Sequence, residues 1–366
     1  MRCLVLHFNK TALQANASVN RQSGVALITV LFIFALASML AVSIQTQQER
    51  TIRQASSSLE NTQTFITLLS IEDIAKAGLM YDAKRDKDAN ELWDTASELW
   101  NQPFPVTLNS SRVAIYIRDL QGLFNLNSLH PNHPQSPEAK IRFTRLLTEL
   151  GIDTSVAQNL REWFTTDSSA NYEYESLTPG YTSPEIQFSH ASELMLIQGM
   201  STKDYRTLEP YITALPMATP LNINTSYPEI LSAWDPKLTL AQSKEIINKT
   251  RSNACGPAER NNFVFKEISE LFEEPAIKSI IGSGESGNDN DNEISGSGSW
   301  DQGDFDVKTK YFSVISVITL EKKETALESI IKRDSENDFI GTIYRDFSRT
   351  PADINRLVKT QNCVGA

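Results

Sequence analysis

The longest run of apolar positions in the chain lies close to its N-terminus. Residues Val25 to Ile44 read VALITVLFIFALASMLAVSI, a stretch of 20 residues without a charge. Only three polar side chains interrupt it, those of Thr29, Ser38 and Ser43. A helix that rises about 1.5 Å per residue needs about 20 apolar residues to cross the ~30 Å hydrocarbon core of a bilayer. The pattern therefore predicts a membrane-spanning helix over 25–44.

The helical pattern continues beyond the apolar run. Mostly apolar residues recur there at alternating spacings of three and four, which places them on one face of a helix. These residues are Ile52, Ala55, Leu59, Thr62, Ile66 and Leu69. We expect this face to pack on a globular head. We expect the helix to end near Gly78, so that the whole N-terminal helix covers 25–80.

Two parts of the chain alternate in the manner of half-buried β-strands. In the first, Val113, Ile115 and Ile117 lie on one side of a strand within 106–118. The second part lies near the C-terminus and consists of short, adjacent stretches that are joined by charged turns. Its stretches are Tyr311–Leu320, Leu327–Ile331 and Phe339–Tyr344. Together they predict an antiparallel sheet.

The stretch between these strands has helical periodicity broken by Pro and Gly. The predicted helices are Ile141–Leu150, Ser155–Phe164, Ala191–Ile197, Tyr205–Leu215, Tyr227–Trp234, Leu240–Arg251 and Phe265–Leu271. Ser136 and Ser201 stand at positions typical of N-caps. The predicted fold class is therefore α+β, with an all-helical domain, 129–275, inserted into an α/β head made of 81–128 and 276–366.

Charge divides the chain at the apolar run. The net charge is −11, yet every charged residue before Val25 is basic, namely Arg2, Lys10 and Arg21. Basic flanks stay on the cytoplasmic side of a membrane helix, so we expect a cytoplasmic N-terminus and a periplasmic globular part. The acidic remainder argues against a nucleic-acid surface, which needs clustered Lys and Arg.

Three interpretations of this N-terminus are open. A cleaved signal peptide would have a shorter apolar core followed by a small-residue site, whereas Ala35–Ala37 lies inside the run. A plain signal anchor would be retained whole. In the third, a basic stretch and Gly24 directly before Val25 resemble the leader of prepilins and pseudopilins. That resemblance implies that prepilin peptidase removes 1–24, methylates Val25 and leaves the helix in the bacterial inner membrane.

Position 29 departs from the pattern of that family. The fifth mature residue of most pilins and pseudopilins is Glu, and here it is Thr29. The Glu is taken to pair with the N-terminal amine of the next subunit up the filament, because an unpaired carboxylate in an apolar bundle is costly. A subunit at the tip has no such neighbour. The resemblance therefore implies a tip subunit, although Thr is also an ordinary residue of membrane helices.

Five motifs farther along the chain occur in a characteristic order. They are Glu98–Trp100, Asp119–Asn127 (DLQGLFNLN), Glu193–Met200, Leu208–Pro216 and Leu221–Thr225 (LNINT). In order and spacing they resemble the K-type minor pseudopilin of the type II secretion system. The chain departs from that family after Trp163, where relatives have an Asp-rich segment and this chain has Thr165–Tyr172.

The resemblance covers nearly the whole chain and has several implications. The head would be pilin-like, and the helical insertion would form two small subdomains. The protein would be a structural component at the tip of the periplasmic pseudopilus that supports export of folded proteins across the outer membrane. Its partners would be the I-type and J-type minor pseudopilins.

Acidic residues gather in a stretch rich in Gly, Ser and Asn, 282–303, and in the residues that follow it. Oxygen ligands at this density suit Ca²⁺, and the resemblance implies calcium because members of the family bind it. The candidate ligands are Asp289, Asp291, Glu293, Asp301 and Asp304. A solvated acidic loop is the other interpretation. Gly282–Gly287 matches G-x-G-x-x-G outside a strand-to-helix turn, so we expect no nucleotide site.

Cysteine and histidine offer little further chemistry. Without the leader and its Cys3, the chain keeps Cys255 and Cys363, which form one disulfide in an oxidising periplasm or remain two separate thiols. His130 and His133 stand beside prolines and predict a surface loop. No Ser-His-Asp, Cys-His or paired-carboxylate signature stands out in the sequence, so we expect a protein without enzymatic activity.

One function of another class competes with assembly. Leu221–Thr225 also resembles the opening of a helix-hairpin-helix repeat, in which backbone amides hold a phosphate. This would make the protein a membrane-anchored DNA-binding protein of the competence type. Glu229 and Asp235 follow where basic residues would be needed. We therefore favour assembly and expect no nucleic-acid partner.

Overall fold

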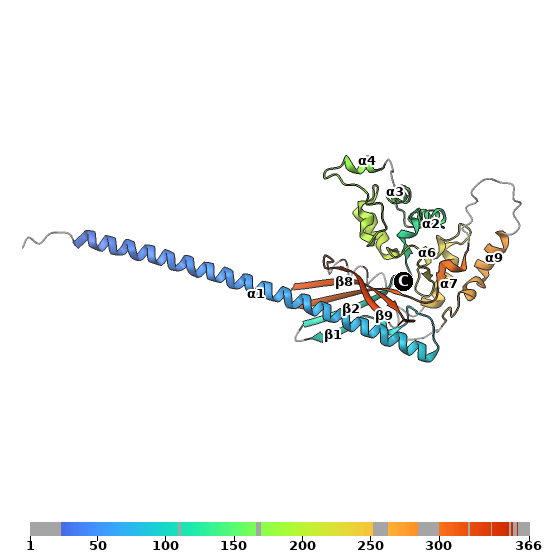
Figure 1. Cartoon of the computed structure of the whole chain (residues 1–366), viewed down its shortest axis with the longest axis horizontal. Coiled ribbons are helices and arrows are strands. Elements are labelled where there is room, and N and C mark those ends of the chain that lie inside the picture. The colour runs from blue at the N-terminus through green and yellow to red at the C-terminus, as the bar shows by residue number, and fades with distance from the viewer. Residues whose placement is uncertain are drawn as a thin grey trace, which may run out of the picture. The chain divides into compact units, whose positions relative to one another are not determined.

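The computed structural model describes residues 23–108, 111–165, 170–251, 263–284, 300–320, 323–337 and 339–350, together with Asp353 and Leu357. The chain divides into two compact units, Met1–Gln63 and Thr64–Ala366. The first contains most of one long helix, and the second contains the sheet and the remaining helices (Figure 1).

Helix α1 runs from Ser23 to Ala89 and is 67 residues long. The predicted end at Gly78 is wrong. Glycine inside a helix costs only about 1 kcal/mol, and the turns beyond it bury Leu79 against the sheet. The helix stops at Asn90, whose φ of 57° is the left-handed conformation of a helix C-terminus, and the N–H of Glu91 donates to the carbonyl of Asp86 at 2.8 Å.

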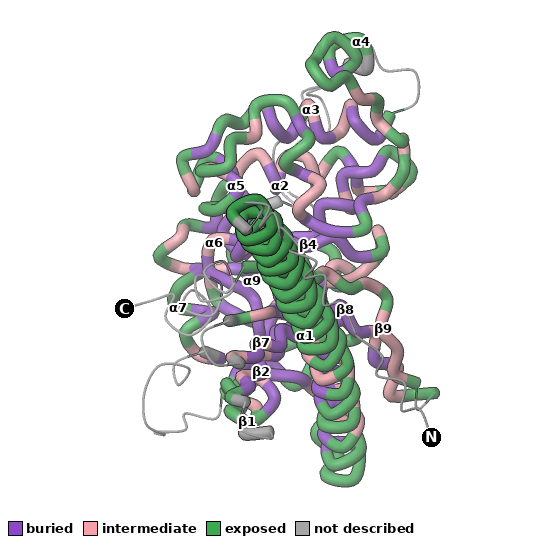
Figure 2. Tube along the Cα trace, turned by 90° about the vertical axis from the view of Figure 1, so that its left-hand side faces the viewer, coloured by how far each residue is buried: buried purple, intermediate pink, exposed green. Residues whose placement is uncertain are grey.

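The face of α1 that packs on the sheet is not the one expected from the sequence. Of the expected face, Ile66 in the unit from Thr64 is 58% exposed, and Leu69 is only partly buried against the sheet. The buried residues of α1 are instead Leu68, Ile71, Glu72, Ala75, Leu79, Asp82 and Asp86. Both sets follow a three-and-four spacing, so α1 carries two apolar stripes and the spacing could not tell which one is covered. Figure 2 shows the exposed side of α1 in green.

The predicted antiparallel sheet is confirmed and has five strands in the order β1-β2-β7-β8-β9. The strands are β1 (Phe104–Leu108), β2 (Ser111–Asp119), β7 (Tyr311–Leu320), β8 (Lys323–Asp334) and β9 (Phe339–Asp346). The single strand expected over 106–118 is a hairpin of β1 and β2, in which Val106 pairs with Val113.

Alternation along each strand sends one set of side chains toward α1. The apolar cluster between helix and sheet contains Leu68, Ile71, Ala75, Leu79, Trp100, Val113, Ile115, Ile117, Phe312, Val314, Ile318, Leu327 and Ile331. Tyr311 and Ile330 belong to a second, larger cluster formed mainly by the helical region. The two faces of the sheet therefore join separate apolar clusters within the same compact unit.

The helical region is present, with differences in detail. Its longer helices are α2 (Ser136–Glu149), α3 (Ser155–Trp163), α4 (Ala170–Glu175), α5 (Thr202–Leu208), α6 (Pro228–Ser232), α7 (Leu240–Arg251), α8 (Ile268–Phe272) and α9 (Pro275–Gly284). Short 3-10 helices are η1 (Leu99–Asn101), η2 (Leu126–Leu129), η3 (Ala191–Leu196), η4 (Glu209–Tyr211) and η5 (Gln302–Asp304). Two short parallel pairs join β3 (Phe124–Asn125) to β4 (Ile212–Thr213), and β5 (Leu221–Asn222) to β6 (Phe305–Asp306).

Local chemistry explains where some of these elements begin and end. The Ser201 hydroxyl accepts a hydrogen bond from the N–H of Asp204, so Ser201 caps α5 as predicted. Ser136 instead lies inside the first turn of α2 and donates to the carbonyl of Leu129. The helix expected over 205–215 ends early because the chain turns through Pro210 and then pairs as β4.

The helical region and the end of the sheet share one apolar core. Phe305 and Val307 lie in the same cluster as the helices, and so do Ile277 and Ile280 of α9. The predicted boundary at 275/276 therefore falls at the start of a helix that packs with its neighbours on both sides. The division of the insertion into two subdomains stays a prediction.

Candidate functional site

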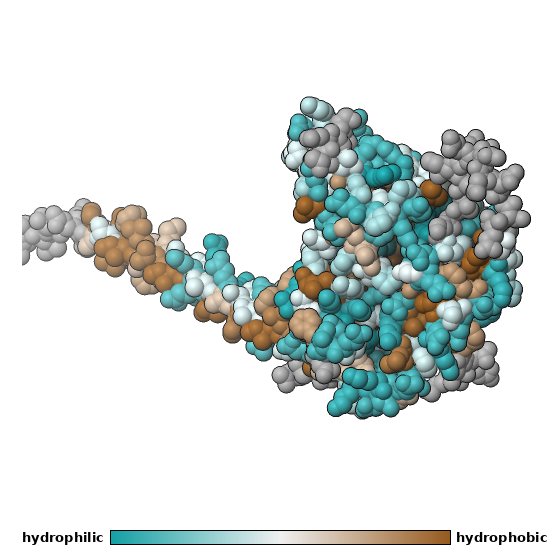
Figure 3. Space-filling model, turned by 45° about the vertical axis from the view of Figure 1, so that its right-hand side comes forward, coloured by the Kyte–Doolittle hydropathy of each residue, from teal (hydrophilic) through white to brown (hydrophobic). Residues whose placement is uncertain are grey.

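The apolar segment forms the N-terminal part of α1. From Gly24 onward α1 is long and apolar enough, by length and composition, to cross a membrane, and its most apolar stretch is not buried anywhere in the protein. Figure 3 shows this apolar surface in brown along the N-terminal part of the helix. Exposed Val, Leu, Ile and Phe side chains in an unbroken run need an apolar surrounding, so the segment fits a membrane anchor.

The residues expected to be processed lie in the first turns of α1. Gly24, Val25 and Thr29 are helical and exposed, and Arg21 lies outside the described residues. A Cβ built on Gly24 would meet no atom within 4 Å, so the helix itself does not require glycine there. The Thr29 hydroxyl donates to the carbonyl of Ala26 at 2.9 Å. Thr29 therefore satisfies its polar group within its own helix and needs no partner.

The motif that begins at Asp119 is the centre of a buried polar network. The Asp119 carboxylate accepts hydrogen bonds from the side chains of Asn222, Thr225 and Thr309, and from the N–H of Gln121. Burial raises the pKa of Asp119 to about 6, although hydrogen bonds from Thr225 and Thr309 oppose that rise. The network joins the end of β2 to two segments that are about 100 and 190 residues away in the sequence.

Gly122 lies directly against Thr225, a member of that network. A Cβ on Gly122 would lie 2.6 Å from the Thr225 hydroxyl and 2.7 Å from the Thr225 carbonyl, so no other residue fits without movement. The neighbouring Gln121 accepts from the N–H of Lys310 at 2.6 Å and donates to the carbonyl of Pro220 at 3.2 Å. Gln121 and Gly122 thus connect the sheet to the helical region at close range.

Two buried asparagines, Asn127 and Asn224, each form a pair of hydrogen bonds with the backbone of a distant phenylalanine. The Asn127 side chain accepts from the N–H of Phe188 at 2.8 Å and donates to its carbonyl at 2.9 Å. The Asn224 side chain accepts from the N–H of Phe265 at 3.0 Å and donates to its carbonyl at 2.9 Å. Each amide therefore pairs with one distant backbone unit, as a neighbouring strand would.

These two places belong to an internal repeat that was not predicted from the sequence. The partners of the asparagines begin the segments FSHASEL, Phe188–Leu194, and FKEISEL, Phe265–Leu271. In each segment the Glu carboxylate accepts a backbone N–H near the start, from Ser189 to Glu193 and from Lys266 to Glu270. The shared signal F-x-x-x-S-E-L is short, and the helices around it differ in length.

The segment Leu221–Thr225, which resembles the opening of a helix-hairpin-helix repeat, is buried. All five side chains of Leu221–Thr225 are at most 5% exposed. The N–H groups of Asn222 and Ile223 donate to the carbonyls of Gln121 and Asp306, and that of Asn224 donates to the Asn222 side chain. These amides are already used within the chain, so the segment offers them to no external phosphate.

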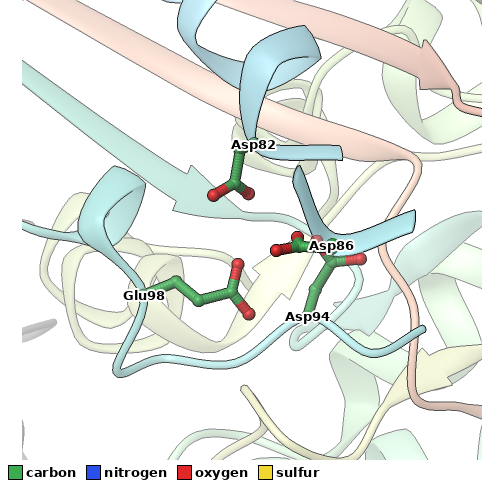
Figure 4. Close-up of side chains that lie close together, drawn as sticks. All are labelled: Asp82, Asp86, Asp94 and Glu98. Carbon is green, nitrogen blue, oxygen red and sulfur yellow. The ribbon is translucent and has the colours of Figure 1, made fainter. Parts of the chain in front are cut away.

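A cluster of four carboxylates, which was also not predicted from the sequence, lies where α1 ends (Figure 4). Its members are Asp82, Asp86, Asp94 and Glu98. Burial, followed by the charges of Asp94 and Asp82, raises the pKa of Glu98 to about 9. The sequence signal was present as two pairs of acidic residues, each pair spaced by four, but a bend of the chain brings the pairs together.

The candidate calcium ligands that the structure describes are engaged in other contacts. Asp304 pairs with Arg142 at 2.9 Å, and both side chains are largely buried. Asp301 accepts from the N–H of Gly303 at 2.9 Å and from the Gln135 amide at 3.3 Å. Asp289, Asp291 and Glu293 lie outside the described residues, so calcium binding by this set stays a prediction.

The remaining candidates are two cysteines and two histidines. Cys255 and Cys363 lie outside the described residues, and their pairing stays a prediction. His130 and His133 lie in the turns between η2 and α2, as predicted, but the surface position is wrong for His130, which is 7% exposed and packs against the ring of Phe164. The ring of each accepts a backbone N–H two residues ahead.

The family model described as type II secretion system (T2SS), protein K matches residues 122–217. This range begins at Gly122 and includes Asn127, Phe188 and the first copy of the repeat. The match therefore covers the first asparagine and the first copy of the repeat, whereas Asp119 and its partners Asn222, Thr225 and Thr309 lie outside it.

Relatives of known name extend the likeness. The chain is 28% identical to the type II secretion system protein K of Pseudomonas aeruginosa, over 86% of this chain and 90% of that protein. It is 30% identical to the protein K of Klebsiella pneumoniae, over 62% of this chain and 75% of that protein. A chain from the crystal structure of the GspK-GspI-GspJ complex of enterotoxigenic Escherichia coli shares the fold, with a TM-score of 0.62 at 21% identity, covering 81% of this chain and 100% of that one. The protein belongs to the type II secretion system protein K family.

Proposed function

We propose that this protein is a structural subunit at the tip of the periplasmic pseudopilus, where it supports export of folded proteins across the outer membrane. The apolar part of α1 anchors it in the inner membrane with a cytoplasmic N-terminus, and the remainder lies in the periplasm. Its partners are the I-type and J-type minor pseudopilins. Membership of the family supports this role, and so does the likeness to a chain that was crystallised in a GspK-GspI-GspJ complex.

The observation that carries the proposal is the second apolar stripe of α1. Within the unit that begins at Thr64, the residues Ile66, Ile74, Ala77 and Tyr81 all lie on the side of the helix opposite the sheet. Ile74 is 51% exposed and Tyr81 is 73% exposed. A helix that needed only to cover its own sheet would be polar on this side.

An exposed apolar stripe at helical spacing is the kind of surface that another helix covers. Ridges formed by residues three and four apart fit into the grooves of a second helix, and burying them removes apolar area from water. The partners proposed here have long N-terminal helices of the same type by resemblance. We therefore assign the stripe to helix packing with the I-type and J-type subunits, and the role to assembly rather than catalysis.

The proposal includes processing by prepilin peptidase between Gly24 and Val25 and methylation of Val25. The open space around Gly24 supports it, because a glycine that the fold does not need is explained by recognition from outside. Thr29 supports the tip position. Its hydroxyl is satisfied by the carbonyl of Ala26, whereas a Glu at this position would require a neighbouring subunit.

Co-purification from membranes tests the proposal. The full chain is expressed with tagged I-type and J-type subunits, either unchanged or as the double variant Ile66→Glu, Ile74→Glu. Both side chains are exposed, so the variant should fold and reach the membrane normally. We expect it to lose most of the co-purified partner, while Lys203→Glu, an exposed change on α5, has no effect. Recovery of partner at the unchanged level in the double variant would contradict the proposal.

A further inference from the structure

We propose that His190 is a pH-sensitive contact between the helical region and the sheet. While its ring is neutral it caps η3 and packs on β9, and protonation of the ring in a mildly acidic medium loosens η3 from the sheet. His190 directly precedes η3 and is 5% exposed. Its ring stacks on the ring of Tyr344 in β9, with centroids 5.0 Å apart and an angle of 11° between the planes. The helical region and the edge strand of the sheet therefore meet at this imidazole.

The Nδ1 atom of His190 acts as a hydrogen-bond acceptor. It accepts the backbone N–H of Ser192 at 3.1 Å, which caps η3, and it lies 2.8 Å from the Ser192 hydroxyl. A neutral imidazole whose Nδ1 accepts carries its proton on Nε2, so a second proton must go to Nδ1. The Ser192 N–H then loses its acceptor, even if the hydroxyl turns to accept the new proton. Protonation of the ring and capping of η3 therefore exclude each other.

The second copy of the repeat starts its helix without histidine. The residue that corresponds to His190 in Phe265–Leu271 is Glu267, which precedes α8. Glu267 is exposed, and its side chain forms no cap. The repeat itself therefore does not require a capping ring at this position. A buried, titratable ring belongs to the first copy, where the segment packs against the sheet.

The surroundings of the ring leave little room to hydrate a positive charge. His190 lines a cavity of about 30 Å³, which holds only about two water molecules. Its Nε2 atom lies 3.9 Å from the Glu328 carboxylate of β8, which is beyond hydrogen-bond length. That carboxylate already accepts hydrogen bonds from Arg349 at 2.6 Å and from Ser313 at 2.8 Å. Glu328 is therefore compensated by other groups before the ring gains a charge.

Charged and titratable groups face His190 from each element that packs around it. They are Arg118 of β2, Tyr205 of α5, Glu209 of η4, Glu328 of β8, Tyr344 and Asp346 of β9, Arg349 after β9, and Glu193 of η3 itself. Burial has the largest effect and lowers the pKa of His190, Glu328 opposes that change, and Arg349 adds to it. The fold therefore favours the neutral ring.

The direction of the pH effect follows from the lowered pKa. The ordinary pKa of histidine is 6.5, and that of folded His190 is lower. The stabilisation by the neutral ring is therefore complete above about pH 6.5 and is lost as the pH falls through the folded pKa. Burial would raise the pKa of Glu328, but Arg349 brings it below its usual range, so Glu328 stays charged meanwhile. In the periplasm proposed above, the helical region would meet this range whenever the medium turns acidic, because porins of the outer membrane are open to water.

Hydrogen exchange of the full chain in detergent, corrected for the intrinsic effect of pH on exchange, tests the contact. Peptides that cover η3 and β9 should keep constant protection above pH 6.5 and lose it by about five- to tenfold at pH 5.5, the range that one histidine proton can contribute there. A peptide that covers α2 should keep its protection. Constant protection of η3 down to pH 5.5, or an equal loss in α2, overturns the proposal. The unchanged chain alone gives this answer, which covers the case of a misfolded variant.

Two matched variants assign the response to one ring. Asparagine is a good N-cap that accepts an N–H and does not titrate, so His190→Asn should keep η3 protected at pH 7.5 and remove the loss at pH 5.5. The ring of His133 likewise accepts the N–H two residues ahead, that of Gln135, but lies between η2 and α2. His133→Asn should therefore leave the response of η3 unchanged. A loss of protection that persists in His190→Asn, or disappears in His133→Asn, overturns the proposal.

Discussion

Gly122 is a residue at which the fold leaves no room for a side chain. Its missing side chain allows the Asp119 segment to pass within contact distance of Thr225, which joins the sheet to the helical region. Gly122→Ala should therefore lower the free energy of unfolding by about 1–3 kcal/mol, the usual cost of overpacking. Chemical unfolding of the full chain in detergent measures it.

Gly78→Ala is the matched control for that measurement. A Cβ at Gly78 meets no atom within 4 Å, and alanine favours the helix by up to about 1 kcal/mol. The control should be neutral or stabilising. Equal destabilisation by both variants would mean that the close approach to Thr225 is not the cause.

Gly24 is expected to matter for processing and not for folding. Gly24→Ala fits the open space around the helix, so the chain should reach the membrane in normal amount. Prepilin peptidase should fail to cleave it, and the leader should remain. Mass spectrometry of the membrane form should show Val25 as a methylated first residue in the unchanged chain only. An intact N-terminus in the unchanged chain, or cleavage after Ala37, would contradict the pseudopilin leader.

At the scale of elements, a buried carboxylate fastens α1 to the sheet. Glu72 is 1% exposed and accepts hydrogen bonds from Ser329, Thr342 and Arg345, with Lys76 at 3.0 Å. Burial alone would raise its pKa, but these bonds together lower the pKa to about 2, against 4.5 for a free carboxyl. The charged form therefore stabilises the fold.

The pH dependence of that contribution has a definite sign. Because the folded pKa lies below the unfolded one, the stabilisation is complete above about pH 4.5 and is lost as the pH falls toward 2. Glu72→Gln should cost about 3 kcal/mol at pH 7, and the difference from the unchanged chain should shrink with acid. Unfolding curves between pH 7 and pH 3 measure it. A difference that is independent of pH would show that Glu72 is not charged in the fold.

The elements could be predicted from the sequence where their signal is local. The span over 25–44 and the strands β7, β8 and β9 follow from unbroken apolar or alternating positions. The covered face of α1 could not be predicted, because two stripes share one spacing and only the sheet decides between them. The end of the helix was missed because the glycine at 78 is tolerated, while the left-handed Asn90 is the true stop.

The candidate site was predictable to a similar degree. The order of motifs from Asp119 onward indicated the family, because each motif is continuous in the sequence. The partners of those motifs were not predictable, since Asn127 and Asn224 reach backbone groups 61 and 41 residues away. The acidic cluster was missed for the same reason, because a change of chain direction at Asn90 brings its two halves together.

At the scale of the whole molecule, the outer side of α1 is the surface assigned to assembly. The helical region and the sheet share a closed apolar core, so the compact unit from Thr64 has little reason to expose large apolar side chains. It nevertheless exposes Ile66, Ile74 and Tyr81 on the outer side of α1. Exposed apolar surface of this kind marks a site of association. The central claim is that the helices of other pseudopilins cover it.

Site-specific photo-crosslinking in living cells tests that claim most directly. A photoreactive amino acid replaces Ile74 on the exposed stripe or, as the control, Lys203 on α5. The account predicts covalent adducts with the I-type or J-type subunit from position 74 and none from position 203. Absence of adducts at 74, or equal adducts at both positions, would contradict it.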